Sequence, residues 1–252
     1  VDGVGVDRVD LDAAEKREIV VTNAPLGNNA AVAEHTLGLI LSLLKRIPYY
    51  NQMIREGKWK GTQFVCGQLM NMTVGIVGFG NIGTRVAKRL KPFETRAIAY
   101  DPYVPTERFE ELGVDSVDLE TLLRSSDIVT LHVPLTRFTR HMIGEKELKM
   151  MKKQAFIVNT SRGSVIDEKA LQVALRNKWI SGAALDVYEE EPPKPDNALL
   201  DFPNVILTPH IAGSTTEANR RLAETAAKDI VRVLGGQKPV HEYKKELLPY
   251  PV

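Results

Sequence analysis

The stretch that decides the fold is TVGIVGFGNIG, at residues 73–83. It joins an apolar run to a helix start through glycines with the spacing G-x-G-x-x-G: Gly78, Gly80 and Gly83. In such a turn the first glycine permits the tight bend, the second lets the backbone approach a pyrophosphate, and the third packs the helix on the strand. The N–H groups of Asn81 and Ile82 would bind the phosphates at the helix N-terminus. The stretch therefore predicts a dinucleotide site.

An acidic residue supports this prediction. Asp101 ends the next apolar run, 18 residues after Gly83, where a carboxylate is expected to accept hydrogen bonds from ribose hydroxyls. The alternative is a simple turn residue before Pro102. No arginine follows Asp101 directly, and its charge would repel a 2′-phosphate, so NAD is the expected cofactor rather than NADP.

Short apolar runs alternate with amphipathic helices from residue 73 onward. This pattern is typical of an α/β fold with a Rossmann-type, doubly wound parallel sheet. Strands are predicted at 73–77, 95–100, 114–117, 127–132, 155–159, 182–186 and 205–207, with an earlier one at 19–23. Helices are predicted at 32–47 (ended by Pro48), 82–91, 119–124, 168–178 and 215–234, the last with a capping box of Ser214 and Glu217.

Two stretches predict hinges, NAPLGNN from residue 23 and TPHIAGS from residue 208. A chain that leaves one lobe at the first hinge and returns at the second has a central dinucleotide-binding domain, residues 30–209. Its two ends, 1–29 and 210–252, would form the second lobe. His210 lies in the second hinge, where clefts between domains form.

Composition excludes several classes of function. The 252 residues carry 33 Lys and Arg against 32 Asp and Glu. No long basic block is present, so no nucleic-acid partner is expected. The longest apolar segment, 37–44, is shorter than the roughly 20 residues of a membrane span. Cys66 is the only cysteine, which predicts a reducing compartment, the cytoplasm, and neither a disulfide framework nor a metal site.

Chemically useful side chains follow the carboxyl ends of the predicted strands: Val133, Thr160, Ser161, Arg162, Asp186 and His210. In a parallel sheet these ends share one edge, where ligands bind. A histidine beside a carboxylate is an acid–base pair, and an arginine matches a substrate carboxylate. Together with a dinucleotide, they favour hydride transfer to or from a 2-hydroxy or 2-keto acid.

Each residue alone also has a plainer interpretation. Arg162 could be a surface ion-pair residue, although Gly163 beside it indicates a close approach to the backbone. Asp186 could cap a loop, and His210 could be a spacer. Glu191 lies in EEEPPKP, which by itself is typical of a solvated loop.

The chain resembles the D-isomer-specific 2-hydroxyacid dehydrogenases, the family of phosphoglycerate dehydrogenase and glyoxylate/hydroxypyruvate reductase. The resemblance rests on GVGVDRVDLDAA, NNAAVAEHTLGLIL, GIVGFGNIG, LHVPLTRFTRHMIG, NTSRGSVIDEKAL, GAALDVYEEEP and TPHIAGST. It implies that Arg162 orients the substrate and His210 exchanges the proton of the 2-hydroxyl, with Glu191 as its partner. It also implies cofactor contacts at Val4, Asn81, Ile82, Asp101, Val133, Thr160, Ser161, Arg162, Asp186 (to the nicotinamide amide), His210 and Gly213. The implied substrate contacts, besides Arg162 and His210, are at Gly3, Val4 and Gly5.

The resemblance further implies a homodimer and a flavodoxin-like substrate domain, which the two chain ends supply only in part. We therefore expect the chain to lack the N-terminal part of that domain. Glu94 stands where the family usually has glycine. An NAD(H)-sensing corepressor-like protein of the same fold is the alternative, and turnover of NADH with a 2-keto acid would discriminate the two.

Overall fold

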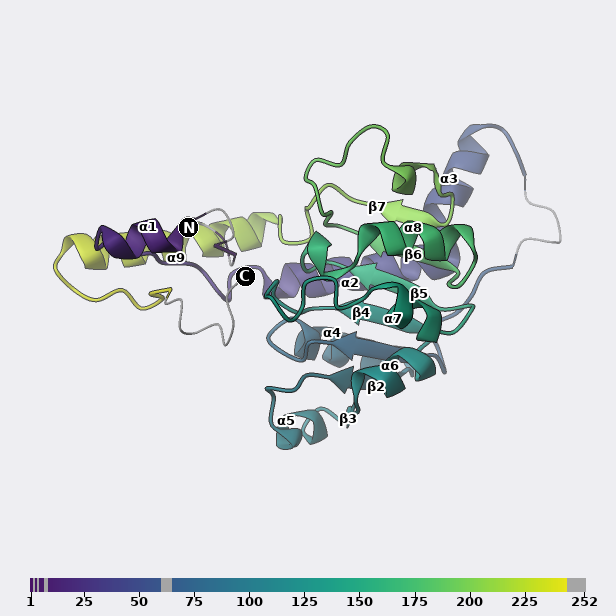
Figure 1. Ribbon diagram of the computed structural model, residues 1–252, viewed down its shortest axis with the longest axis horizontal. Coiled ribbons are helices and arrows are strands. Elements are labelled where there is room, and N and C mark those ends of the chain that lie inside the picture. Colours follow the sequence, from purple (N-terminus) through teal and green to yellow (C-terminus); the bar gives the residue numbers. More distant parts are fainter. Residues whose placement is uncertain (2, 4, 7–8, 60–64, 244–252) are drawn as a thin grey trace.

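A parallel sheet forms the centre of the molecule. The structure is a computed structural model that describes residues 1, 3, 5, 6, 9–59 and 65–243. The seven strands are β1 Thr73–Val77, β2 Arg96–Tyr100, β3 Asp115–Ser116, β4 Ile128–Leu131, β5 Phe156–Asn159, β6 Gly182–Leu185 and β7 Val205–Leu207. Their order is β3-β2-β1-β4-β5-β6-β7 (Figure 1). All pairs of strands are parallel. β1 to β3 are added toward one edge of the sheet and β4 to β7 toward the other, so the order switches between β1 and β4. This confirms the predicted Rossmann-type fold.

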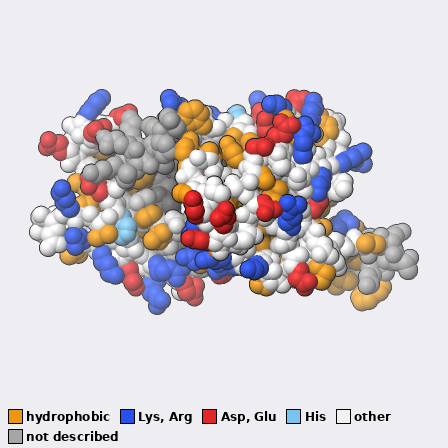
Figure 2. Space-filling view, turned by 90° about the horizontal axis from the view of Figure 1, so that it is seen from below, with side chains coloured by type: hydrophobic (Ala, Val, Ile, Leu, Met, Phe, Trp, Pro, Cys, Tyr) orange, Lys and Arg blue, Asp and Glu red, His pale blue; other side chains and the backbone are white. Residues whose placement is uncertain are grey.

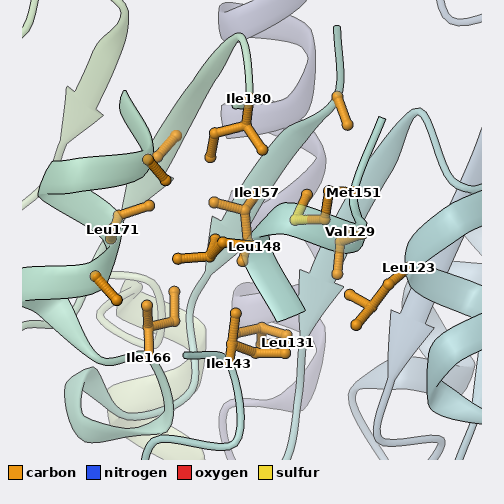
Figure 3. Packing of buried hydrophobic residues seen from close by; sticks show 14 of the residues in the cluster. Leu123, Val129, Leu131, Ile143, Leu148, Met151, Ile157, Ile166, Leu171 and Ile180 are labelled. Atoms are coloured by element: carbon orange, nitrogen blue, oxygen red, sulfur yellow. The ribbon is translucent and has the colours of Figure 1, made fainter. Parts of the chain in front are cut away.

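Helices cover both faces of this sheet. The α-helices are α1 Leu11–Lys16, α2 Asn29–Lys45, α3 Ile47–Arg55, α4 Gly83–Leu90, α5 Thr106–Glu110, α6 Leu119–Ser125, α7 Glu145–Met150, α8 Glu168–Arg176 and α9 Thr216–Leu234. One apolar cluster joins the sheet to α6, α7 and α8 (Figure 3). A second joins the opposite face to α2, α4 and α5.

Alternation along each strand produces these two clusters. On β6, Ala183 and Leu185 belong to the first cluster and Ala184 to the second. On β5, Ile157 and Val158 divide in the same way. Successive side chains of a strand point to opposite faces, so a strand covered on both sides is apolar throughout. Full burial of each large aliphatic side chain stabilises the fold by about 1.5–3 kcal/mol.

The two ends of the chain contact each other beside the sheet. Thr22 forms an isolated antiparallel bridge with Glu242, and Arg221 Nε of α9 donates to the carbonyl of Gly27 at 2.9 Å. Figure 1 shows α1 and α9 lying on the same side, away from the strands. The prediction of a strand at 19–23 is wrong, because a single bridge replaces the ladder of bonds that a strand needs.

Two predicted helix boundaries are also wrong. Arg46, at φ +52°, ends α2 in the left-handed region. Pro48 does not stop this helix but lies in the first turn of α3, where its missing N–H has no intrahelical partner to lose. The start of α9 is capped by Thr215, whose side chain accepts the Ala218 N–H at 3.1 Å, instead of the expected Ser214.

The face of the molecule seen in Figure 2 shows no dominant charge. Basic and acidic side chains lie mixed on the face seen in Figure 2, with apolar groups between them. Within the described ranges, no helix combines the length and the apolar character needed to cross a membrane.

Candidate active site

A cleft of about 820 Å³ opens at the carboxyl edge of the sheet. It is bounded by loops after β1, β4, β5, β6 and β7 and by the N-terminal segment. Most of the predicted site residues line it: Gly3, Gly5, Asn81, Ile82, Val133, Thr160, Ser161, Arg162, Asp186, Glu191, His210 and Gly213. Gly78, Gly80, Gly83 and Asp101 lie beside it without lining it, and Val4 lies outside the described residues. Parallel strands therefore bring together residues that are far apart in sequence, as predicted.

The glycine loop has the shape that a dinucleotide needs. Gly78 has φ +92°, and a Cβ there would lie 2.6 Å from the carbonyl oxygen of His132. A Cβ on Gly83 would overlap the carbonyl oxygen of Gly78, so α4 packs closely on the loop. A Cβ on Gly80 would meet nothing within 4 Å, so a ligand can approach the backbone there. The loop fits a pyrophosphate at the start of α4.

Asp101 supports this loop from the end of β2. One carboxylate oxygen accepts the Phe79 N–H at 2.8 Å, and the other accepts the Tyr103 N–H at 3.0 Å. A carboxylate oxygen can accept two hydrogen bonds, so ribose hydroxyls can still bind. The structure thus adds a loop-holding contact to the ribose role predicted for Asp101.

His210 and Glu191 form the pair implied by the resemblance. His210 Nδ1 lies 2.7 Å from Glu191 Oε2, and the other oxygen of Glu191 accepts the Tyr188 N–H at 3.2 Å. No described residue is bonded to the second ring nitrogen, Nε2, and the His210 side chain is half exposed. The ring is therefore oriented by Glu191 and can exchange a proton through Nε2.

Asp186 anchors the loop that carries His210. This residue is fully buried. Its carboxylate accepts the Thr208 hydroxyl at 2.6 Å, the Ile211 N–H at 2.9 Å and the Ala212 N–H at 2.8 Å. Its carbonyl accepts the His210 N–H at 2.8 Å, which holds His210 at a φ of +53°. Sequence reasoning missed this anchoring role, and the nicotinamide contact implied by the resemblance stays a prediction.

The Arg162 loop is fixed from two sides. Asn159 accepts the Ser161 N–H at 3.0 Å and donates to the Arg162 carbonyl at 2.9 Å. A Cβ on Gly163 would overlap the peptide between Tyr188 and Glu189. The close approach predicted at Gly163 is therefore confirmed, and it is an approach of two loops of the chain itself.

Three buried polar atoms at the cleft have no hydrogen-bond partner among the described residues. They are Asn28 Oδ1, Asn29 Nδ2 and His132 Nδ1, and all three residues line the cleft. Burial lowers the pKa of His132 to about 3, so its ring is neutral at physiological pH. Buried polar groups are normally paired, with protein, a ligand or ordered water, so these atoms are available to a ligand in the cleft. Nothing in the sequence marked these residues beyond their positions: Asn28 and Asn29 lie in the first predicted hinge, and His132 directly follows β4.

The described residues contain no candidate metal site. Among the described residues, no group of three or more His, Cys, Asp or Glu side chains is arranged to hold a metal ion. The donor set of the cleft, which combines glycine-loop amides, an arginine and a His–Glu pair, fits an organic anion and a dinucleotide.

Comparison with known proteins agrees with this geometry. The family model described as "D-isomer specific 2-hydroxyacid dehydrogenase, NAD binding domain" matches residues 37–212. A D-3-phosphoglycerate dehydrogenase of Archaeoglobus fulgidus is 47% identical over 234 residues, which cover 93% of this chain and 44% of the relative. A glyoxylate reductase of Thermofilum pendens is 45% identical, over 97% of this chain and 74% of the relative.

A solved structure gives the same result. The crystal structure of D-lactate dehydrogenase from Aquifex aeolicus, complexed with NAD and lactic acid, matches with a TM-score of 0.86 at 33% identity. The match covers 93% of this chain and 75% of that one. The chain spans less than half the length of the phosphoglycerate dehydrogenase relative. Its sheet, its glycine loop and its sequence over residues 37–212 place it in one family. The chain belongs to the D-isomer-specific 2-hydroxyacid dehydrogenases and contains their NAD-binding domain.

Proposed function

We propose that the protein containing this chain transfers a hydride between NAD and a small D-2-hydroxy acid or 2-keto acid. The observation that carries the proposal is the 2.7 Å pair of His210 and Glu191. It lies in one cleft with Arg162 and with the start of α4. An acid–base pair, a guanidinium and a dinucleotide loop are together what this reaction requires.

The residues of the cleft have distinct roles in this proposal. Arg162 binds the substrate carboxylate, and the N–H groups of Gly3 and Gly5 assist it; Val4, between them, lies outside the described residues. During oxidation the Nε2 atom of His210 takes the proton of the substrate's 2-hydroxyl group, and Glu191 stabilises the resulting imidazolium. During reduction His210 returns that proton to the carbonyl oxygen. The bound cofactor supplies or accepts the hydride at the C2 carbon.

The cofactor site follows the same edge of the sheet. The glycine loop would bind the pyrophosphate and Asp101 the adenosine ribose. The nicotinamide half would be bound by Val133, Thr160, Ser161, Arg162, Asp186, His210 and Gly213. The unpaired atoms of Asn28, Asn29 and His132 support a ligand that extends to the hinge.

We infer that residues 30–209 form the cofactor domain and that residues 1–29 and 210–252 belong to the substrate lobe. The bridge of Thr22 with Glu242 supports this division. A homodimer is also proposed. The apolar face of α2 is largely buried within one chain, so little of it is left for contact with a second copy. The support for a dimer comes from a groove between α2 and the edge strand β7, which a second copy can occupy. The lone Cys66 supports a cytoplasmic location.

The test is a substrate panel. NADH oxidation would be followed with glyoxylate, hydroxypyruvate and pyruvate, and NAD reduction with 3-phosphoglycerate, for this chain and for the full-length protein. The control His210→Asn should lower kcat by about 10²–10⁴-fold with little change in NADH affinity. NADH binding without turnover of any 2-keto acid by the full-length protein would instead support the NAD(H)-sensing alternative. The relatives found are dehydrogenases and reductases, which do not favour that alternative.

A further inference from the structure

Three loops of the cleft meet at one ionic cluster. Glu189, in the loop after β6, accepts at its Oε1 atom both the ring of His141, at 2.7 Å, and the N–H of Glu168, at 3.2 Å. His141 comes from the loop after β4, and Glu168 begins α8 at the end of the loop after β5. We call these residues the His141–Glu189–Glu168 cluster.

The contact between Glu168 and Glu189 is reciprocal. The carboxylate of Glu168 accepts the N–H of Glu189 at 3.1 Å and also the side-chain amide of Asn197 at 2.6 Å. The backbone N–H of His141 donates to the carbonyl of Ser164 at 2.7 Å. The loops after β4, β5 and β6 are therefore joined by bonds in both directions at a single point.

This point lies next to the acid–base pair. Glu191 follows Glu189 by two residues, and Glu189 itself lines the cleft. Gly163, which follows Arg162 directly, packs on the Tyr188–Glu189 peptide so closely that a Cβ would overlap it. A displacement of Glu189 would therefore be transmitted to both Glu191 and Arg162.

A contribution to stability does not explain the cluster. The side chains of His141 and Glu189 are 43% and 32% exposed, and ion pairs at such positions contribute only about 0–1 kcal/mol. What distinguishes the pair is the number of loops that it joins. Glu190 also forms an ion pair, at 2.8 Å with Lys194, but both of its members belong to one loop.

We propose that Glu189 is a positioning residue, which holds Glu191 against His210 by tying its loop to His141 and Glu168. The inference rests on the proposed acid–base role of His210. Its measurable consequence is the protonation of the His210 ring, because a carboxylate held beside an imidazolium stabilises the charged form. When the loop loosens, the carboxylate spends less time at 2.7 Å from the ring, and the charged ring loses part of this stabilisation.

The charges around His210 come from several loops. Glu189 and Glu191 lie in the loop after β6, Asp186 directly follows that strand, and Arg162, in the loop after β5, lines the same cleft. His141 adds a charge from the loop after β4 when it is protonated. The variants must therefore separate a change of charge from a change of position.

Four variants make this separation. Glu189→Ala removes both bonds and the charge. Glu189→Gln removes the charge but keeps an oxygen that can accept both bonds, because one oxygen makes both of them. Glu190→Ala removes an equal charge one residue nearer to Glu191 and breaks no bond between loops. His141→Ala removes the partner of Glu189 in the ion pair, and the only charge that this variant can remove is positive.

The measurement is a titration of isotope-labelled histidine rings by NMR on the whole chain, with His210 assigned from the signal missing in His210→Asn. We expect Glu189→Ala to lower the pKa of His210 by about 0.5–1 unit. Glu189→Gln should lower it less, and Glu190→Ala should leave it unchanged. His141→Ala should also lower it, although the loss of a positive charge alone would raise it.

Three results would overturn the inference. They are an unchanged His210 pKa in Glu189→Ala, equal shifts in Glu189→Ala and Glu189→Gln, and a raised or unchanged pKa in His141→Ala. If Glu189→Ala does not fold, His141→Ala decides alone by the sign of its shift. The titration needs no turnover, so a failure of the substrate panel would count only against the proposed function.

Discussion

The substitution Asp186→Asn tests how the loop of His210 is held. The buried carboxylate accepts three hydrogen bonds, two on Oδ1 from Thr208 and Ile211 and one on Oδ2 from Ala212. Asparagine has one oxygen and one NH₂ group in these places. Whichever way the amide turns, the NH₂ group faces a backbone N–H and leaves it unpaired.

The cost follows from these bonds. One buried N–H left unpaired costs about 1–3 kcal/mol, and the remaining bonds lose the extra strength that a charged acceptor gives. Relief of the buried charge offsets part of this loss. We therefore expect Asp186→Asn to lower the free energy of unfolding by about 2–4 kcal/mol. The loss of the anchor should also lower kcat, because His210 is held at φ +53° by this loop.

The assay is urea unfolding at neutral pH, followed by circular dichroism, beside an NADH-linked rate measurement on the full-length protein. Asp201→Asn is the matched control, because Asp201 is exposed and its change should stay within about 0.5 kcal/mol. A loss below about 1 kcal/mol in Asp186→Asn would refute the anchoring argument, since it would mean that no N–H is left unpaired.

Three further predictions follow from other sites. Asp101→Ala removes the acceptor of the Phe79 N–H and should weaken NADH binding and narrow the preference for NAD(H) over NADP(H) in fluorescence titrations; equal affinities in the unaltered chain would contradict this. Burial alone would raise the pKa of Asp229, but hydrogen bonds from the N–H groups of Val240 and His241 and from the His241 ring lower it overall. The folded form therefore gains stability from Asp229 above the ordinary carboxyl pKa and loses it as the pH falls through the lowered value. Asp229→Asn should thus reduce the Tm at pH 7, by an amount that disappears in acid, and a difference independent of pH would be evidence against the ionised contact. Glu94 is exposed at φ +56°, a left-handed conformation that costs a residue other than glycine roughly 1–2 kcal/mol. The greater freedom of glycine in the unfolded chain offsets about 0.5–1 kcal/mol of this, so Glu94→Gly should raise the free energy of unfolding by about 0.5–1 kcal/mol. A lower Tm would exclude strain at that turn.

The sheet was predictable because its signals are local. A strand buried on both faces is an apolar run that ends at turn residues, and all seven predicted strands from residue 73 onward are present, with ends that differ by at most one residue. The glycine loop is equally local, since Gly78 has a positive φ and Gly83 packs on the carbonyl of Gly78, only five residues before it. α1 and α5 were missed because they have only six and five residues. α3 was missed because Pro48, which was expected only to stop the preceding helix, lies in its first turn.

The contacts between loops could not be predicted from the sequence as well as the sheet was. Glu191 resembles a solvated residue in sequence, and only the fold brings it to His210. The anchoring role of Asp186 depends on Ile211 and Ala212, 25 and 26 residues further along the chain. The strand expected at 19–23 needed a partner, and the described chain supplies only the bridge to Glu242. Pairing across such distances is a property of the fold and has no local signal.

The distribution of unpaired polar atoms shows where the cleft is prepared for a ligand. The groups that would do chemistry are held by the chain itself: Glu191 orients the ring of His210, and Asp186 fixes its loop. The buried cleft atoms without a partner in the described chain lie at the start of α2 and directly after β4, at Asn28, Asn29 and His132. A buried polar group left unpaired costs about 1–3 kcal/mol, so a ligand that pairs these atoms recovers that energy on binding. A ligand bound beside Asn28, Asn29 and His132 would therefore gain binding energy on that side of the cleft, while bonds within the chain already hold Glu191 and His210 in place.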